Sequence, residues 1–114
     1  MRQAWIRKRG EYLKVFRGGE KRVGRNVNVW VLRGQPDRRL GVIVAKAAVR
    51  KAVRRNRLKR VLRESWRNRL KSVEDGAWVV VSVSKRMVGE RELVEEFWRI
   101  LKERGVADGD VEAP

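Results

Sequence analysis

Residues 54–63 read Arg54-Arg55-Asn56-Arg57-Leu58-Lys59-Arg60-Val61-Leu62-Arg63. Six of these ten residues are cations, and the stretch contains neither proline nor glycine, so nothing in it interrupts a helix. Apolar residues recur at the three-to-four spacing of one helical face, at Leu58, Val61, Leu62, Trp66 and Leu70. The pattern predicts a long helix within residues 50–71 that packs one side against a core.

The other side of this helix is polar and basic. At 100° per residue, five side chains gather there: Asn56, Lys59, Arg60, Arg63 and Arg67. Glu64 is the one acid between residues 50 and 71, so like charges at i,i+3 and i,i+4 destabilise the isolated helix by about 0.2–0.5 kcal/mol per pair. A basic run is often no more than a solvated helix face, but this imbalance favours contact with a polyanion.

Length and charge restrict the class of protein. The chain has 114 residues, which suits one domain with its own core. Its formal charge is +16, and residues 1–71 hold 24 Lys and Arg against 4 Asp and Glu, a net charge of +20. Such a charge points to a nucleic acid or an anionic membrane surface. The N-terminal two-thirds of the chain are therefore expected to meet the polyanion.

Two residue types that often carry chemistry are absent, because the sequence has no cysteine and no histidine. This excludes a disulfide framework, a thiolate metal site and an imidazole base. No apolar run approaches the roughly 20 residues of a membrane span, and the N-terminus lacks a signal-peptide core. We expect a soluble, cytoplasmic protein without conventional side-chain catalysis.

We interpret four acids as a solvated helix face rather than a metal cluster: Glu90, Glu92, Glu95 and Glu96.

The N-terminal part predicts an arm and a helix. Residues 1–9 are basic and have no periodic pattern, so we expect an irregular arm. A short helix is predicted at about residues 11–17, where Tyr12 and Phe16 share a side at i,i+4 and Gly18-Gly19 ends the helix.

The remaining elements follow from changes of period. Residues 26–32 alternate and residues 40–45 are β-branched, which predicts two strands, and the turn residues 34–37 suggest that they form a hairpin. A valine-rich strand at residues 77–84 and an amphipathic helix at residues 89–104 complete the chain. The order α-β-β-α-β-α predicts an α+β sandwich with a small mixed sheet. The strands before and after the long helix should be parallel, so the helix forms a β-α-β crossover between them. Such crossovers are right-handed in nearly all proteins, and this rule predicts a right-handed one here.

The motif Arg55-Asn56-Arg57, together with the residues that follow it, resembles the Arg-Asn-Arg motif of the bacterial ribonuclease P protein component. The stretch Glu11-Tyr12-Leu13-Lys14-Val15-Phe16-Arg17-Gly18-Gly19 is similar to that family's first helix. Residues 39–44 resemble the strand that leads toward the motif, and residues 77–84 the strand after it. The likeness covers about residues 6–104 in order, which is more specific than a basic helix alone.

The resemblance implies a fold and an activity. The fold is ribosomal protein S5 domain 2-like, with a left-handed crossover through the basic helix, against the general rule. One RNA-binding domain of this family's type would span residues 1–105. Residues 106–114 are small and acidic, and we expect them to form a disordered tail. Ribonuclease P is an endonuclease whose RNA subunit carries out the Mg²⁺-dependent removal of the 5′ leader from precursor tRNA. The protein would bind that RNA one to one, bind the leader, hold no metal or other cofactor itself, and be inactive alone.

The resemblance also assigns residues to two sets. The leader cleft would use Tyr12, Phe16, Asn28, Trp30, Arg55, Asn56, Lys59 and Arg63. The catalytic RNA would be contacted by Lys46, Arg50, Lys51, Arg54, Arg57, Arg60 and Arg67. Aromatic faces stack unpaired bases, and flanking cations follow the sugar–phosphate backbone.

Alternatives to these assignments stay open at this point. Without the resemblance, Tyr12 and Phe16 are as compatible with a core as with a stacking surface, whereas we assign Trp66, Trp78 and Trp98 to packing. The chain departs from the family at residues 46–50, where Ala47 and Ala48 replace two cations and Arg50 replaces a glycine. A second function is a small basic structural RNA-binding protein of ribosomal type, which would bury the aromatic residues. A third possible function is that of an architectural DNA-binding protein, but the sequence contains no recognition-helix motif that would favour it. We expect neither DNA nor a membrane as partner.

Overall fold

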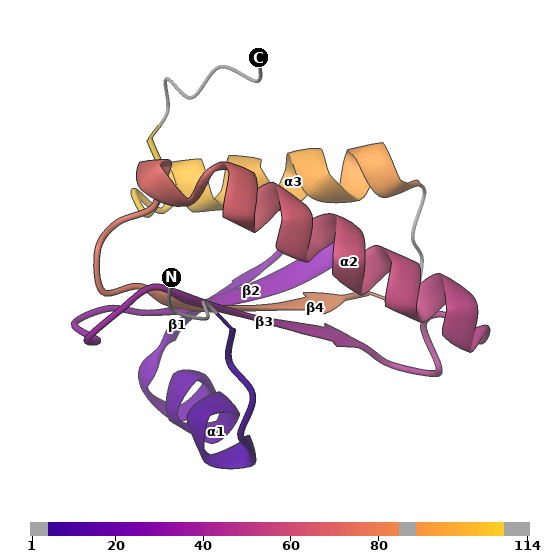
Figure 1. The fold of residues 1–114 in the computed structure, drawn as a ribbon, viewed down its shortest axis with the longest axis horizontal. Coiled ribbons are helices and arrows are strands. Elements are labelled where there is room, and N and C mark those ends of the chain that lie inside the picture. The colour runs from indigo at the N-terminus through magenta and orange to yellow at the C-terminus, as the bar shows by residue number, and fades with distance from the viewer. Residues whose placement is uncertain (1–4, 85–88, 109–114) are drawn as a thin grey trace.

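The computed structural model describes residues 5–84 and 89–108, and it consists of a four-stranded sheet with helices on both faces (Figure 1). Two helices lie on one face of the sheet and one on the other (Figure 1). In chain order the elements are α1 (Arg9–Gly18), β1 (Glu20–Val23), β2 (Val27–Leu32), β3 (Arg39–Val44), α2 (Ala52–Asn68), a 3-10 turn (Leu70–Ser72), β4 (Trp78–Val83) and α3 (Glu90–Glu103). The mixed α+β fold expected from the sequence is confirmed.

The strand order is β1-β2-β4-β3, which corrects one prediction. The strands at residues 26–32 and 40–45 do not form a hairpin, because β4 lies between them and pairs antiparallel with β2. The hairpin partner of β2 is β1, which the sequence did not predict. The residues of β1 are Glu-Lys-Arg-Val and mostly exposed, so this edge strand has no burial pattern that a sequence could reveal.

The connection from β3 through α2 to β4 has the hand that the resemblance implies. β3 and β4 are parallel, with Leu40 opposite Val79 and Val42 opposite Val81. In Figure 1, β3 lies nearer the viewer than β4, and α2 returns above the sheet against the direction of both strands. The crossover is therefore left-handed, and the general right-handed expectation is wrong for this chain.

The main core lies between the sheet and the helix pair α2 and α3. The long helix buries Leu58, Leu62 and Trp66, as its apolar spacing predicts. Complete burial of one such leucine side chain stabilises the fold by about 1.5–3 kcal/mol. The packing roles predicted for Trp66, Trp78 and Trp98 are confirmed, because all three are buried.

Glu96 corrects the expectation of a solvated acidic face on α3. Its side chain is buried, with 3% exposure, and it binds the turn between β1 and β2. Its Oε2 accepts the backbone N–H of Arg25 at 2.5 Å, and its Oε1 accepts the backbone N–H and the side-chain Nδ2 of Asn26 at 2.9 and 2.8 Å. This carboxylate therefore organises the β1–β2 hairpin from a helix about 70 residues later in the chain.

Residues 106–108, which were expected to belong to a disordered tail, pack against the domain. Val106 is buried, with 1% exposure, and Ala107 forms a β-bridge with Val73. The backbone N–H of Asp108 also donates to the carbonyl of Ser72 at 2.9 Å. These contacts hold residues 106–108 against the domain, so the prediction is wrong there. Residues 109–114 lie outside the described part of the chain.

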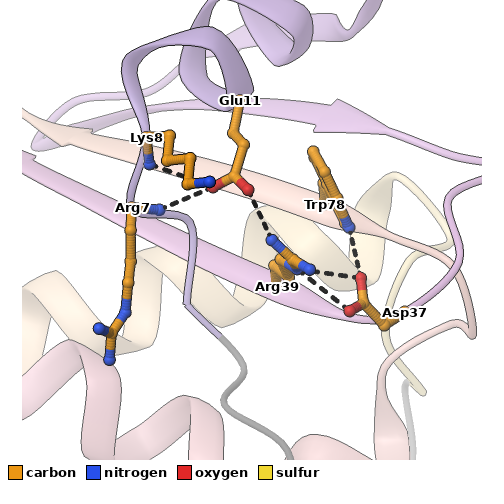
Figure 2. A network of polar contacts seen from close by, with 6 residues as sticks. All are labelled: Arg7, Lys8, Glu11, Asp37, Arg39 and Trp78. Atoms are coloured by element: carbon orange, nitrogen blue, oxygen red, sulfur yellow. Dashed lines mark hydrogen bonds and ion pairs between the residues drawn. The ribbon is translucent and has the colours of Figure 1, made fainter.

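A polar network attaches the start of α1 to the sheet (Figure 2). One oxygen of Glu11 accepts the backbone N–H groups of Arg7 and Lys8, at 2.9 and 3.1 Å, and the other accepts Arg39 Nη1 at 2.8 Å. By accepting donors that precede the helix, Glu11 extends α1 to Arg9, two residues before its predicted start. The Arg7 N–H above all, followed by Lys8 and Arg39, holds the pKa of Glu11 below its usual value, although burial opposes this.

The network continues through Arg39 to Trp78 (Figure 2). Arg39 Nε lies 3.1 Å from both carboxylate oxygens of Asp37, and Trp78 Nε1 donates to Asp37 Oδ1 at 2.8 Å. The guanidinium of Arg39 also lies 4.8 Å from the Trp78 ring centroid. These contacts join α1, β3 and β4, and so fix the helix that carries Tyr12 and Phe16.

Removal of the Glu96 carboxylate should destabilise the protein. We expect Glu96→Ala to lower the free energy of unfolding by more than about 2 kcal/mol, because each buried donor left without an acceptor costs about 1–3 kcal/mol. Glu95→Ala is the matched control, since Glu95 is exposed and, among the described residues, pairs with Arg91 alone. This substitution should change stability by no more than about 0.5 kcal/mol. Urea unfolding of both variants measures the difference, and equal midpoints would contradict the role of Glu96.

Glu11 should make stability depend on acid pH. Its pKa is lower in the folded protein than in the unfolded chain, where it is roughly 4.3, so the ionised group stabilises the fold above that pH. This stabilisation is lost as the pH falls through the folded-state pKa. Urea unfolding of the wild type and Glu11→Gln should therefore show a gap in stability at neutral pH that closes in acid. A gap that is the same at all pH values would show that the charge of Glu11 is not responsible.

Candidate nucleic-acid interface

An aromatic cluster lies where α1 packs on β2. The rings of Phe16 and Trp30 meet edge to face with centroids 4.9 Å apart, and the Tyr12 centroid is 6.4 Å from that of Phe16. All three residues are partly buried and pack against buried neighbours that include Val15 and Val80. Each ring therefore packs against the protein and keeps part of its area accessible, so Tyr12, Phe16 and Trp30 are neither fully core nor fully surface residues.

Tyr12 connects this cluster to the edge of the sheet. A Cβ atom at Gly41 would lie only 2.7 Å from the Tyr12 ring, so the glycine lets the ring rest directly on β3. Burial raises the pKa of the Tyr12 hydroxyl, and the positive charge of Arg63 opposes the rise. Arg63 belongs to α2, so the aromatic cluster and the basic helix meet at the edge strand β3.

Asn28 and Lys21 lie beside Trp30. Asn28 is two residues before Trp30 on the same face of β2, and its Oδ1 is buried without a hydrogen-bond partner in the described part of the chain. Lys21 pairs with Trp30 across the β1–β2 ladder, and its Nζ lies 5.2 Å from the ring centroid. Lys21 was missed from the sequence because β1 was not predicted.

The basic side of α2 forms a second part of the surface. The predicted gathering is confirmed, because the same residues line one open hollow of about 410 Å³: Asn56, Lys59, Arg60, Arg63 and Arg67. Trp5 also lines it, with its ring centroid 5.9 Å from the guanidinium of Arg63 and 5.7 Å from that of Arg67. The sequence placed Trp5 in an irregular arm and gave no sign of this contact.

The two arginines of the Arg-Asn-Arg motif have partners within the protein. Arg55 Nη1 donates to the carbonyls of Val49 and Arg50, at 3.0 and 2.7 Å, and so braces the loop before α2. This is the loop in which the chain departs from the family pattern. Arg57 forms an ion pair with Glu90 of α3. Their predicted contacts with RNA stay predictions, and each residue also has a structural role.

The loop before α2 and the first turn of this helix carry further cations. Those proposed to contact the catalytic RNA here are exposed: Lys46, Arg50, Lys51 and Arg54. The first turn of α2 contains no acid, and the unsatisfied N–H groups of a helix start add partial positive charge. The positive potential therefore extends from the hollow to the N-terminal end of α2.

Among residues 5–84 and 89–108, no group of three or more His, Cys, Asp or Glu residues is arranged to hold a metal ion. In the same part of the chain, no helix combines the length and the apolar character needed to cross a membrane.

Sequence comparison identifies relatives for most of the chain. The family model described as Ribonuclease P matches residues 1–104. The ribonuclease P protein component of Pseudomonas paraeruginosa is 35% identical over 83 residues, which cover 67% of this chain and 60% of the relative. The chain thus matches less than two-thirds of that relative's length. The ribonuclease P protein component of a Pseudanabaena species is 30% identical over 109 residues, which cover 92% of this chain and 94% of the relative.

Solved structures have the same fold. The RNase P protein of Staphylococcus aureus superimposes with a TM-score of 0.83 at 20% identity, covering 94% of this chain and 100% of that one. The RNase P protein of Thermotoga maritima, solved with 1-(4-fluorophenyl)-2-thiourea, has a TM-score of 0.76 at 29% identity and covers 85% and 96%. The family match along the sequence and the shared fold lead to one assignment: this chain belongs to the ribonuclease P protein family.

Proposed function

We propose that this chain is the protein subunit of ribonuclease P and that it binds both the catalytic RNA and the 5′ leader of precursor tRNA. The observation that carries the proposal is the junction at β3. The Tyr12 ring rests on Gly41 of this strand, while Trp5, which bridges the neighbouring Leu40, lies 5.9 Å from the guanidinium of Arg63 on α2. Stacking surfaces next to cations are the arrangement that binds single-stranded RNA with little sequence preference. A subunit that serves many different leaders requires such tolerance.

The protein and the RNA have different roles in this proposal. The protein binds and orients the substrate, while hydrolysis depends on Mg²⁺ ions held by the RNA, and the protein alone is inactive. The absence of histidine and cysteine from the sequence supports this assignment. The leader exists only in the precursor, so its contacts with the protein add affinity for substrate and none for mature tRNA. We further propose a one-to-one complex with the RNA in the cytoplasm, and no role for DNA.

Reconstitution tests the function directly. Purified protein added to a bacterial ribonuclease P RNA at low Mg²⁺ should stimulate cleavage of precursor tRNA at the 5′ end of the mature sequence. The protein without RNA should cleave nothing, because its role is binding. Gel analysis of labelled precursor measures both results. A folded protein that gives no stimulation, or RNA-free protein that cleaves precursor, would contradict the proposal.

The aromatic cluster should determine selectivity for precursor. Phe16→Leu keeps an apolar side chain of similar size but removes the stacking face, so affinity of the holoenzyme for precursor should fall by roughly 5- to 150-fold. Affinity for mature tRNA should stay nearly constant. Leu32→Ala is the control, because Leu32 packs against the same cluster but has no ring.

Thermal melts of both variants separate stability from binding. Leu32→Ala should lower the melting temperature and leave the precursor-to-mature affinity ratio unchanged. If Phe16→Leu behaves in the same way, Phe16 is a core residue and the cleft assignment fails.

A further inference from the structure

Trp5 differs from the other tryptophans in its surroundings. Trp66, Trp78 and Trp98 are buried, and Trp30 belongs to the aromatic cluster. Trp5 is partly exposed and lines the hollow on the outer side of α2. It is held there by the backbone, because it forms a parallel β-bridge with Leu40 and the next N–H, that of Ile6, donates to the Leu40 carbonyl at 2.9 Å. The position of the ring is therefore anchored to the edge of the sheet.

The surroundings of Trp5 are mainly basic. Four cations line the hollow: Lys59, Arg60, Arg63 and Arg67. In the described part of the chain, none of them belongs to an ion pair, whereas Arg57 pairs with Glu90 and Arg39 with Glu11 and Asp37. Glu64 is the acidic residue in the lining. Four cations against this one carboxylate give the hollow a net positive charge. Like charges this close favour an anion that lies between them.

Trp5 and Tyr12 are anchored to neighbouring residues of β3. Trp5 forms its β-bridge with Leu40, and the Tyr12 ring rests on Gly41. The guanidinium of Arg63 lies 5.9 Å from the Trp5 ring centroid. The hollow of about 410 Å³ falls within the roughly 300–1,000 Å³ of small-ligand sites and is open to solvent. A strand of RNA that leaves the Tyr12 side therefore has a cation and then a second aromatic ring along its path.

We propose that this hollow holds one unpaired RNA nucleotide, with its base stacked on Trp5 and its phosphate between Lys59, Arg63 and Arg67. Stacking on an indole suits any base, and arginine side chains suit the phosphate, so the site needs no particular sequence. The inference rests on the proposed RNA binding and adds to it a second stacking site, across β3 from the aromatic cluster. The nucleotide comes either from the leader or from the catalytic RNA.

Two substitutions at Trp5 test the stacking, with oligouridylate as the probe. Trp5→Leu keeps an apolar side chain against the core but removes the ring, and it should weaken binding by roughly 5- to 150-fold at fixed salt. Trp5→Phe should retain most of the affinity. Fluorescence anisotropy measures both, and thermal melts check that the variants are folded.

Salt dependence tests the phosphate contact separately. Arg67→Gln should reduce the slope of log K against log salt by about one unit, while Trp5→Leu should leave the slope unchanged. Arg91→Gln removes the same charge from the exposed side of α3, where Arg91 pairs with Glu95, and it should not alter the slope. Glu64→Gln should strengthen binding, because it removes the carboxylate from the lining.

The holoenzyme identifies the source of the nucleotide. If the leader supplies it, Trp5→Leu lowers affinity for precursor tRNA and not for mature tRNA. If the catalytic RNA supplies it, the same variant weakens assembly of protein and RNA and affects both tRNAs equally. Either result supports the site.

Cross-linking keeps the test decisive even if Trp5→Leu fails to fold. RNA that contains 5-iodouridine should cross-link to Trp5 of the native chain under ultraviolet light, as located by mass spectrometry. A folded Trp5→Leu protein with native affinity, or cross-links that never map to Trp5, would overturn the site. Stimulation of precursor cleavage by the native chain is measured independently, so failure of this site and failure of the proposed function are distinguishable.

Discussion

The central strand β4 is buried on both faces, and the rest of the structure depends on covering it. Val79, Val81 and Val83 face the core below α2 and α3, whereas Trp78 and Val80 face α1. A strand covered on both sides needs a helix layer on each side. The short helix α1 supplies the second layer, and it packs on β2 and β4 through Val15 and the aromatic cluster. The same packing that completes the fold thus creates a partly open aromatic surface.

Electrostatic pairing separates the structural charges from those available to a ligand. Several carboxylates join segments that are distant in the chain. Glu11 of α1 and Asp37 both pair with Arg39, and Asp37 also accepts the Trp78 N–H of β4. Glu96 binds the β1–β2 turn. The outer side of α2 has no comparable partners in the described part of the chain, so its cations remain available. Because such repulsion weakens a helix by itself, the apolar side of α2 must supply the compensating stability. Burial of Leu58, Leu62 and Trp66 does this.

The aromatic cluster and the basic side of α2 meet at the edge strand β3, because a single strand separates the helices on its two faces. Gly41 allows Tyr12 to lie directly on β3, and α2 covers the opposite face of the same strand. Arg63 can therefore act on Tyr12 although the two residues belong to helices on opposite faces of the sheet. Any single strand of RNA bound at this edge would contact both helices, which explains how a small domain can present stacking and charge together.

Features that depend on local residue patterns could be predicted from the sequence. Helical spacing defined the apolar and basic sides of α2, a period-two run located β2, and β-branched and valine-rich runs located β3 and β4, because each pattern lies within a few neighbouring residues. Ordered motifs led to the family and to its left-handed crossover. Four features became visible in the folded chain alone: the strand order, the buried role of Glu96, the bracing contacts of Arg55 and Arg57, and the place of Trp5. Each of these depends on which distant segments meet, and burial of the whole sheet selects those partners. A helix-face pattern can show that Glu96 or Trp5 lies on a surface, but it contains no information about what covers that surface.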